Sequence, residues 1–406
     1  MPTPSLGRAQ PSSWVMRGTP AYRRISLALF LAGFATFSLL YCVQPLLPAF
    51  VTHFGVAPAT SALSVSVTTG CLAVSIVLAG AFSEGLGRRG LMFASMLLAA
   101  LCNLFAAFVP GWEALLAARA LEGFLLGGVP AVAMAYLAEE IEPAGLGFSM
   151  GLYVGGSALG GMLGRVAVSA MTEYWDWRWA LGALSLVDVL AAVGFYLLLP
   201  ASRNFVRKSG LGMAYHLQAW GRHLAQPGLP GLFLIAFGLM GVFVSIYNYA
   251  GFLLGGSPFA LSPLQISHVF YAYLFGTVTS PLAGALADRL GRGPVLISGV
   301  ALMALGVLLT LLPALWAVVC GIVLLTIGFF AAHSVASSWV GQWAKQAKGH
   351  ASSLYLLGYY LGSSLLGAGS GWFLQHAGWA GLVACMLVLL AGVLWLALRV
   401  QRLENK

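Results

Sequence analysis

The sequence predicts an all-α integral membrane protein whose twelve transmembrane helices form two pseudo-symmetric bundles of six. Three observations predict this fold class. Hydrophobic residues make up 60% of the 406 residues and charged residues only 8%, whereas soluble domains contain about 25% charged residues. Long stretches carry no charge, and the two halves of the chain repeat the same motifs. The composition excludes a soluble enzyme, a disordered chain, a nucleic-acid-binding module and a disulfide-rich secreted scaffold.

The twelve helices follow from stretches without charge, because a spanning helix needs roughly 20 apolar residues. Four stretches lack Asp, Glu, Lys and Arg and can each hold two helices: 25–83, 223–287, 293–344 and 349–398. Their internal turns are expected where Gly, Pro and polar residues gather, at 52–58, 255–258, 312–314 and 375–378. Four spans with few charges complete the set, at 91–110, 113–138, 145–168 and 178–199.

Lys and Arg predict the orientation, because loops rich in these residues stay in the cytoplasm. With the N-terminus inside, 17 of the 20 Lys and Arg residues fall in cytoplasmic segments. Of the others, Arg178 lies in an outer loop, and Arg119 and Arg165 lie within spans. Both termini are therefore expected in the cytoplasm.

A basic stretch rich in Pro and Gly, at 200–230, divides the chain into its two halves. Within it Met213, Leu217, Trp220 and Leu224 form the apolar stripe of a short helix. This helix either lies flat on the inner leaflet or packs on the cytosolic ends of the spans. The predicted order is a cytosolic tail (1–24), an N-terminal bundle (25–199), the linker (200–230), a C-terminal bundle (231–399) and a second cytosolic tail (400–406).

The repeats connect the chain to a known family. Residues 80–89, GAFSEGLGRR, match 284–293, GALADRLGRG, and two shorter motifs recur at offsets between 204 and 207 residues. Six helices per half give both halves the same orientation, the parallel-repeat arrangement. The first motif resembles the Gly-x-x-x-Asp-Arg-x-Gly-Arg-Arg loop of the major facilitator superfamily, with Glu84 and Gly85 at the Asp and Arg positions. Residues 130–137 and 332–341 resemble its bacterial arabinose-efflux-permease-like (YnfM-type) subgroup.

This resemblance implies a secondary transporter of a bacterial inner membrane that works by alternating access. It favours proton-coupled efflux of a small organic solute such as a sugar, drug or metabolite. An importer or uncoupled facilitator is the alternative, and a membrane-embedded enzyme is a remote one. The expected partners are the solute, protons and lipid, without nucleic acid, for a monomer that is not an enzyme. No cofactor is expected, because the sequence has no Walker loop, no His-Glu-x-x-His and no Cys/His metal spacing.

The repeated loops are expected, by this resemblance, to latch the cytoplasmic side closed. Their carboxylates, Glu84 and Asp288, can cap a neighbouring helix N-terminus, and their glycines permit a tight turn. Charges that serve only to orient the chain are the alternative. The predicted gate residues are Gly80, Glu84, Gly87, Arg88, Arg89, Gly284, Asp288, Arg289, Gly291 and Arg292.

Arg119 and Glu122 are the predicted proton-coupling pair. They lie one turn apart in the fourth span and share a face, and a charge inside a span indicates function by default. The motif resembles the family's fourth helix, whose Arg is linked to proton coupling, with Glu122 where Gln is usual. Glu122 would carry the proton, whereas a static ion pair is the alternative. His333 in the tenth span is a further candidate for proton coupling or substrate binding, or a hydrogen-bonded core residue.

Tyr41, Gln44, Tyr247 and Asn248 are, with His333, the predicted substrate contacts. By resemblance, helices one, four, seven and ten line a central cavity, which polar side chains prefer to hydrocarbon. Interfacial tyrosines and helix contacts are the alternative. Pro45 and Pro48 are expected to bend the first helix beside this site.

Glycines at spacing four predict close helix approach in the fifth and eleventh spans. They resemble the antiporter motif, which implies a pliable interface between the halves, and ordinary tight packing is the alternative. The interface glycines are Gly151, Gly155, Gly160, Gly362 and Gly367. Arg165 is expected to extend outward or to meet Glu173 or Asp176. Asp188, in the sixth span, has no predicted partner.

Overall fold

The structure is a computed structural model that describes residues 14–82, 87–204 and 212–404. These residues form helices joined by short loops. The helices are α1 (Pro20–Tyr41), η1 (Gln44–Leu46), α2 (Leu47–Phe54), α3 (Pro58–Ser61), α4 (Leu63–Phe82), α5 (Arg88–Ala106), α6 (Trp112–Leu126), α7 (Pro130–Glu140), α8 (Pro143–Met171), α9 (Trp177–Leu198), α10 (Met213–Ala225), α11 (Leu229–Gly255), α12 (Pro263–Ser267), η2 (His268–Tyr271), α13 (Ala272–Leu290), α14 (Arg292–Leu309), α15 (Leu315–Trp343), α16 (Lys348–Gly369) and α17 (Gly371–Glu404).

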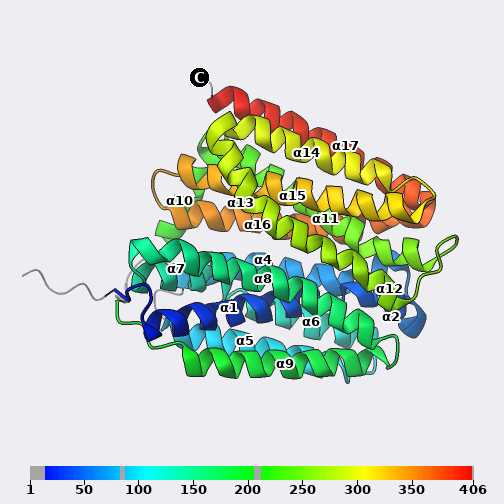
Figure 1. Cartoon of the computed structure of the whole chain (residues 1–406), viewed down its shortest axis with the longest axis horizontal. Coiled ribbons are helices and arrows are strands. Elements are labelled where there is room, and N and C mark those ends of the chain that lie inside the picture. The colour runs from blue at the N-terminus through cyan, green and yellow to red at the C-terminus, as the bar shows by residue number, and fades with distance from the viewer. Residues whose placement is uncertain (1–13, 83–86, 205–211, 405–406) are drawn as a thin grey trace, which may run out of the picture.

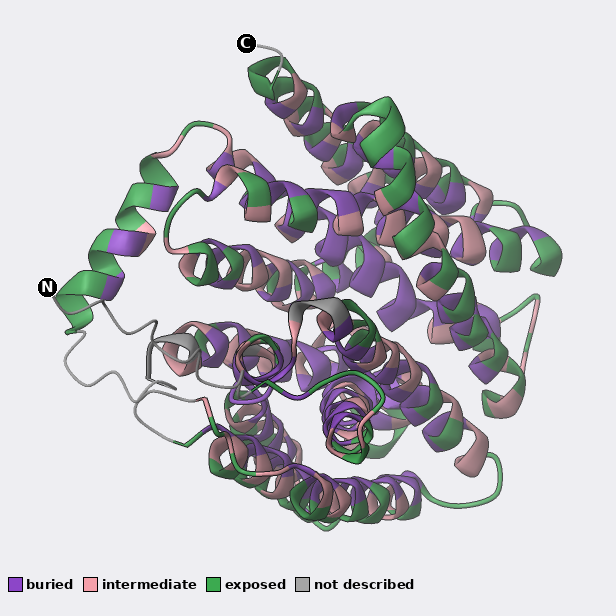
Figure 2. Cartoon of the chain, turned by 60° about the vertical axis from the view of Figure 1, so that its left-hand side comes forward, coloured by how far each residue is buried: buried purple, intermediate pink, exposed green. Residues whose placement is uncertain are grey.

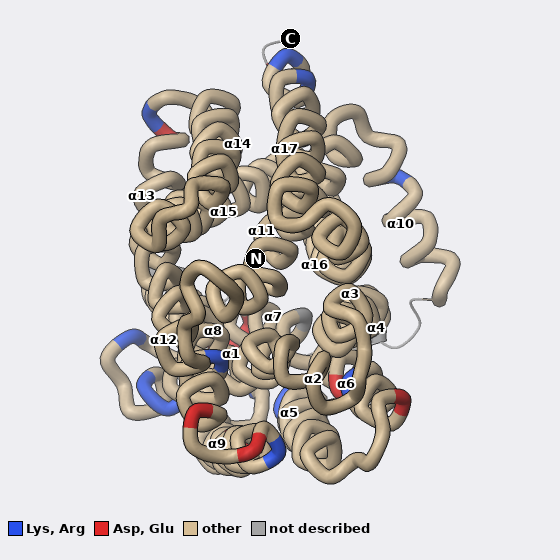
Figure 3. The backbone as a smooth tube through the Cα atoms, turned by 90° about the vertical axis from the view of Figure 1, so that its right-hand side faces the viewer, with Lys and Arg blue, Asp and Glu red and all other residues tan. Residues whose placement is uncertain are grey.

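Ten of the helices, some joined across kinks, are long and apolar enough to cross a membrane within the described residues. The predicted fourth and eleventh spans, α6–α7 and α16, complete the twelve. The helix α16 tolerates Ser, Gly and Tyr because α4 and α11 pack against it. The all-α membrane fold class is confirmed. Figure 3 shows how few positions along the helices carry charge.

Proline and glycine break two of the spans. The first span stops as α1 at Tyr41 and resumes through η1 and α2, where Pro45 and Pro48 stand near the helix starts. Proline removes a backbone donor and cannot extend the preceding helix, so the α-helix is interrupted beside Gln44. The fourth span is likewise divided into α6 and α7: Gly127 and Gly128 lie between the two helices, and Pro130 is the first residue of α7.

Two boundaries differ from the sequence expectation. The helix α1 begins at Pro20 rather than at residue 25, because the Thr19 side chain caps it by accepting from the Tyr22 N–H. At the other end, α16 stops at Gly369, and the expected turn at 375–378 is a break at Gly378 inside α17. Gly378 has φ 62°, a left-handed conformation that favours glycine.

The helices form two groups that lie side by side (Figure 1). The first group contains α1 to α9, held mainly by α1 on α8 and α4 on α6, and the second contains α11 to α17. Buried positions gather on the inward faces of the helices (Figure 2). The end of the molecule that holds α10 and the described ends of the chain is here named the linker side, and the opposite end the far side.

The two groups meet chiefly through α4 on α16 and α8 on α12. Several hydrogen bonds join them within the described residues. Ser364 Oγ donates to Ser66 O at 2.7 Å, and Ser169 Oγ donates to Pro263 O at 2.7 Å. The N–H of Leu264 donates to Glu173 at 3.1 Å. All these residues lie toward the far-side ends of their helices, so this end is closed.

The linker helix α10 packs against the second group, beside α16 (Figure 3). His216 Nδ1 lies 2.9 Å from His350 Nε2, and Trp220 Nε1 donates to Ser353 Oγ at 3.2 Å. Leu217 and Leu224 of the predicted apolar stripe remain 60% and 54% exposed. The helix therefore docks through a neighbouring face, and most of its apolar stripe stays available to lipid.

Candidate functional site

The predicted proton-coupling pair is a fully buried ion pair in the first group. Arg119 and Glu122 are both 0% exposed, and Arg119 Nη1 lies 2.6 Å from Glu122 Oε2. The next residue, Gly123, lets α6 approach α4 closely, since a Cβ there would lie 2.0 Å from Thr68 O. The sequence spacing thus correctly placed both charges on one face of the helix.

Arg119 also holds the broken end of α1. Its Nη2 donates to Leu40 O at 2.9 Å and its Nη1 to Leu39 O at 3.2 Å. The last turn of a helix leaves carbonyls without helical donors, and a cation is favoured there by the helix dipole. Arg119 therefore joins the Glu122 carboxylate to the point where the first span bends.

Glu122 has one oxygen without a partner. Its Oε2 receives Arg119, whereas its buried Oε1 accepts no hydrogen bond from the described residues. A buried oxygen in that state is costly for an ionised carboxylate, whereas a proton on it would neutralise the charge. The group can therefore exist in two protonation states that differ in how strongly they bind Arg119.

A second buried carboxylate lies in the same group. Asp188, which had no predicted partner, accepts a hydrogen bond from Ser38 Oγ, which is 2.7 and 2.9 Å from its two oxygens. One turn away, Ser185 Oγ accepts from Asn103 Nδ2 at 3.0 Å, and Asn103 Oδ1 accepts from Arg119 at 3.3 Å. Polar residues of α1, α5, α6 and α9 therefore line the interior of the first group.

Gln44 connects the predicted substrate residues across the two groups. Its Nε2 donates to Asn248 Oδ1 at 2.7 Å, and Asn248 Nδ2 donates to Gly367 O at 3.1 Å. Both amides are almost fully buried, at 2% and 1% exposure. The structure thus brings Gln44 and Asn248 together where α1 gives way to η1.

The two predicted tyrosines contact different partners. The Tyr41 hydroxyl lies 3.5 Å from Ser363 Oγ of the second group. The Tyr247 hydroxyl lies 2.8 Å from Thr326 Oγ1, and its ring stacks on Phe270 at 5.7 Å. Tyr247 therefore hydrogen-bonds within its own group, while Tyr41 reaches toward the other.

His333 is not brought together with the buried ion pair, since it belongs to α15 in the second group. Its Nδ1 lies 2.9 Å from the Tyr355 hydroxyl, and its ring lies parallel to Phe329 at 5.6 Å. Phe329 stacks in turn on Phe243 at 4.0 Å, and Phe243 contacts Tyr247 at 4.9 Å. His333 is only half-buried and reaches the other substrate candidates through these rings.

The predicted gate loops make contacts inside their own groups. Arg88 donates to both oxygens of Glu139, at 2.7 and 2.5 Å, and Arg89 donates to Tyr196 O at 2.6 Å. Asp288 lies 3.9 Å from Arg292, and its side chain is 76% exposed. Gly87 directly precedes α5, and Gly291 directly precedes α14. Arg289 is exposed, and a Cβ on Gly284 would have no neighbour within 4 Å. Glu84 lies outside the described residues, as do the surroundings of Gly80, so the latch stays a prediction.

The interface glycines require a correction. A Cβ on Gly160 would lie 2.1 Å from Phe34 O, and one on Gly362 would lie 2.0 Å from Phe237 O. These contacts pack α8 on α1 and α16 on α11, inside each group rather than between groups. Gly151 and Gly155 face open space, and Gly367 alone of the five approaches both groups, near Asn248 and Ser66. Spacing four allows close approach but does not identify the neighbouring helix.

Arg165 is the functional candidate that the sequence reasoning placed wrongly. It is 1% exposed and points between the groups instead of outward. Its Nε donates to Gln44 Oε1 at 2.6 Å, and its guanidinium lies over the Tyr41 ring at 4.5 Å. Glu173 instead accepts from Leu264, and Asp176 caps α9. The sequence feature that could have indicated its inward direction is its position on the glycine-rich helix α8, whose glycines pack against α1.

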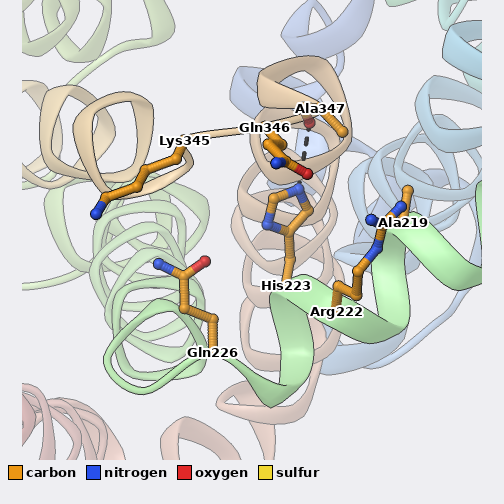
Figure 4. A pocket seen from close by; sticks show the side chains of 7 residues that line it. All are labelled: Ala219, Arg222, His223, Gln226, Lys345, Gln346 and Ala347. Atoms are coloured by element: carbon orange, nitrogen blue, oxygen red, sulfur yellow. Dashed lines mark hydrogen bonds between the residues drawn. The ribbon is translucent and has the colours of Figure 1, made fainter.

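A pocket of about 300 Å³ on the linker side is separate from these residues (Figure 4). It lies between α10 and the loop that follows α15. Arg222 and His223 come from the helix, and Lys345 from the loop. No predicted proton or substrate residue lines it.

Comparison with known proteins identifies the family. A sequence model of the Major Facilitator Superfamily matches residues 29–263 and 254–406. The chain is 44% identical to the inner membrane transport protein YnfM of Escherichia coli (strain K12) over 97% of this chain and 94% of that protein. It is 42% identical to the MFS-type transporter YybF of Bacillus subtilis (strain 168) over 95% of each.

The fold comparison agrees with the sequence comparison. A bacterial homologue of the human lysosomal transporter Spinster, solved in an inward-facing and unoccupied conformation, superimposes with a TM-score of 0.76. The match covers 94% of this chain and 98% of that one at 14% identity. The resemblance seen in the sequence is confirmed, and the chain belongs to the major facilitator superfamily of membrane transporters.

Proposed function

We propose that this transporter exports a small organic solute in exchange for protons, by alternating access. The proposal places the linker side in the cytoplasm of a bacterial inner membrane, and it makes the protein a monomer without enzymatic activity or cofactor. The charge asymmetry of the loops supports the orientation. The closed far side supports a state that faces the cytoplasm.

The buried Arg119–Glu122 pair carries the proposal. Glu122 Oε1 has no partner among the described residues, while Oε2 holds Arg119 at 2.6 Å. A proton on Glu122 removes the opposite charge from Arg119. Taking one partner from a buried ion pair costs about 3–5 kcal/mol, so the two protonation states favour different surroundings for the guanidinium.

The break in the first span connects this proton site to the substrate residues. Arg119 holds the carbonyls of Leu39 and Leu40 at the end of α1, and Gln44 follows directly after the break. Gln44 in turn bonds Asn248 of the other group. A shift of Arg119 is therefore transmitted along one turn of backbone to a further contact between the two groups.

The substrate residues in this proposal are Tyr41, Gln44, Tyr247, Asn248 and His333. Gln44 and Asn248 lie where the groups meet, and the tyrosines and His333 extend the surface along the rings of the second group. The gate loops would close the linker side when the far side opens. Import and uncoupled diffusion use the same fold, and the measurement below separates them from export.

The test uses everted membrane vesicles with an imposed inside-acid gradient and a fluorescent pH reporter. Sugars, drugs and metabolites are added one at a time to wild type and to Glu122→Gln. Export by antiport predicts proton release on addition of a substrate, in wild type only. Glu113→Gln is the matched control, because Glu113 begins the same helix but is exposed.

Two results would contradict the proposal. If Glu122→Gln keeps wild-type proton release at equal expression, Glu122 does not carry the proton. If solute flux is present but indifferent to the gradient, the protein is a facilitator.

A further inference from the structure

Arg165 is a second buried arginine, and its surroundings differ from those of Arg119. Arg119 has Glu122 as its counterion. Within the described residues, no carboxylate lies at salt-bridge distance from Arg165, although its side chain is almost fully buried. An unpaired charge in a membrane span is costly, and by default such a residue indicates a functional site.

Within the described residues, Arg165 donates its hydrogen bonds to neutral acceptors. Its Nε donates to Gln44 Oε1 at 2.6 Å and its Nη1 to Gly161 O at 2.5 Å. A guanidinium has five N–H donors in a planar fork that matches a carboxylate. The amide and the carbonyl therefore supply acceptors without supplying the negative charge.

Aromatic rings from both groups surround the guanidinium. Its carbon lies 4.5 Å from the centre of the Tyr41 ring, 4.9 Å from Tyr273 and 5.5 Å from Phe270. Ring faces attract a cation and exclude water, yet they do not neutralise it. Such a setting holds a cation in place and leaves it able to bind an anion strongly, because the local dielectric is low.

The rings continue away from Arg165 along the second group. Tyr273 contacts Phe243 at 5.6 Å, Phe243 stacks on Phe329, and Phe329 lies parallel to His333. These rings form an apolar surface that runs from Arg165 to the imidazole of His333. A solute with an anionic head and an apolar body matches this arrangement, because the head can meet the guanidinium while the body lies along the rings.

We propose that Arg165 binds the carboxylate of the transported solute, and that the solutes are small organic carboxylates with an apolar or aromatic body. This rests on the proposed function, namely transport of a small organic solute. The carboxylate takes the place of Gln44 at the guanidinium. Because Gln44 also bonds Asn248 across the groups, substrate binding loosens one of the contacts that hold the two groups together.

The test measures binding without a proton gradient. Purified transporter is heated with phenylacetate or with phenylacetamide, which has nearly the same shape but no charge. Phenylacetate is expected to raise the unfolding temperature of the wild type, and phenylacetamide is not. Arg165→Gln is expected to weaken the phenylacetate effect by at least about tenfold in concentration, since a charge-assisted bidentate contact is lost.

Two further variants keep the result interpretable. Arg165→Lys preserves the charge for folding but loses the fork, so it should retain only part of the effect. Arg399→Gln is the matched control, because Arg399 also lies over a ring, Trp395, but is exposed, and it should respond as the wild type does.

Equal effects of the acid and the amide, no effect of either, or an acid effect that survives Arg165→Gln would each overturn the proposal. Failure of proton coupling is distinguishable. If Glu122→Gln loses proton release but keeps phenylacetate binding, the Arg165 binding site and the solute class are both supported. Wild type that binds phenylacetate but never moves protons overturns the antiport proposal alone.

Discussion

Replacing Gln44 by Ala is expected to weaken the closure of the far side. The substitution removes the 2.7 Å bond to Asn248 and the 2.6 Å bond to Arg165. A buried polar group left without its partner costs roughly 1–3 kcal/mol. An opening of the far side lets water hydrogen-bond to the side chains of Asn248 and Arg165 and recovers that cost. The population of the open state should therefore rise about 5–150-fold, which corresponds to 1–3 kcal/mol.

The assay is thiol labelling at the far side. Ala59 lies beneath Gly371 of the second group, where a built Cβ would be 2.7 Å from the Ala59 Cα. Ala59 is partly exposed in the closed far side, so a Cys introduced there, in a background without the five native cysteines, is expected to react faster when the groups separate. The labelling rate with a membrane-impermeant maleimide then reports the open fraction.

A double-mutant cycle identifies the Gln44–Asn248 contact as the cause. Gln44→Ala and Asn248→Ala together should change labelling less than the sum of the single variants, because both remove one shared bond. Gln375→Ala is the control, since Gln375 is an exposed amide in the first turns of α17. Unchanged labelling in Gln44→Ala, or strictly additive effects in the cycle, would refute the assignment.

Three further predictions follow from packing and charge. Gly160→Ala forces a Cβ against a backbone carbonyl at 2.1 Å and should cost about 1–3 kcal/mol, whereas Gly155→Ala faces open space; the melting temperatures of the two purified variants compare them. Asp288→Asn should weaken closure of the linker side, seen as faster labelling of cysteines at the helix ends, and unchanged labelling would argue against a latch. Arg119→Gln leaves Glu122 buried alone and should destabilise the protein by about 3–5 kcal/mol; adding Glu122→Gln should restore part of the loss in the same melting assay, and no restoration would show that the pair is not coupled.

The sequence was sufficient where function depends on spacing along one helix. Arg119 and Glu122 are three residues apart, so helical geometry alone places them on one face, and the structure shows the contact. The interruption of the first span beside Pro45 was equally local, because proline acts on its own backbone, whereas the division of the fourth span at Pro130 was not predicted. Charge-free stretches predicted the spans for the same reason, because each spanning helix needs enough consecutive apolar residues of its own to cross the hydrocarbon core.

The sequence was insufficient where function depends on which helix faces which. Arg165 lies near the outer end of its span, and only the packing of α8 against α1 turns it inward to Gln44. The glycines show the same limit, since Gly160 and Gly362 permit close approach but the partner proved to be a helix of the same group. In the internal repeat, the helix of His333 corresponds to the helix of Glu122, yet the two residues lie in different groups of the fold.

The Gln44–Asn248 bond joins residues 204 positions apart, within the range of offsets that relates the two halves of the chain. The matched motifs 37–41 and 243–247 of these two helices are offset by 206 residues, so the bond joins nearly equivalent positions of the two halves. A side-chain amide is both donor and acceptor, so it pairs with another amide whichever half provides the hydrogen. A carboxylate or an ammonium meeting its own copy would repel it. The contact between the two halves therefore needs no charge, and either half can supply the hydrogen.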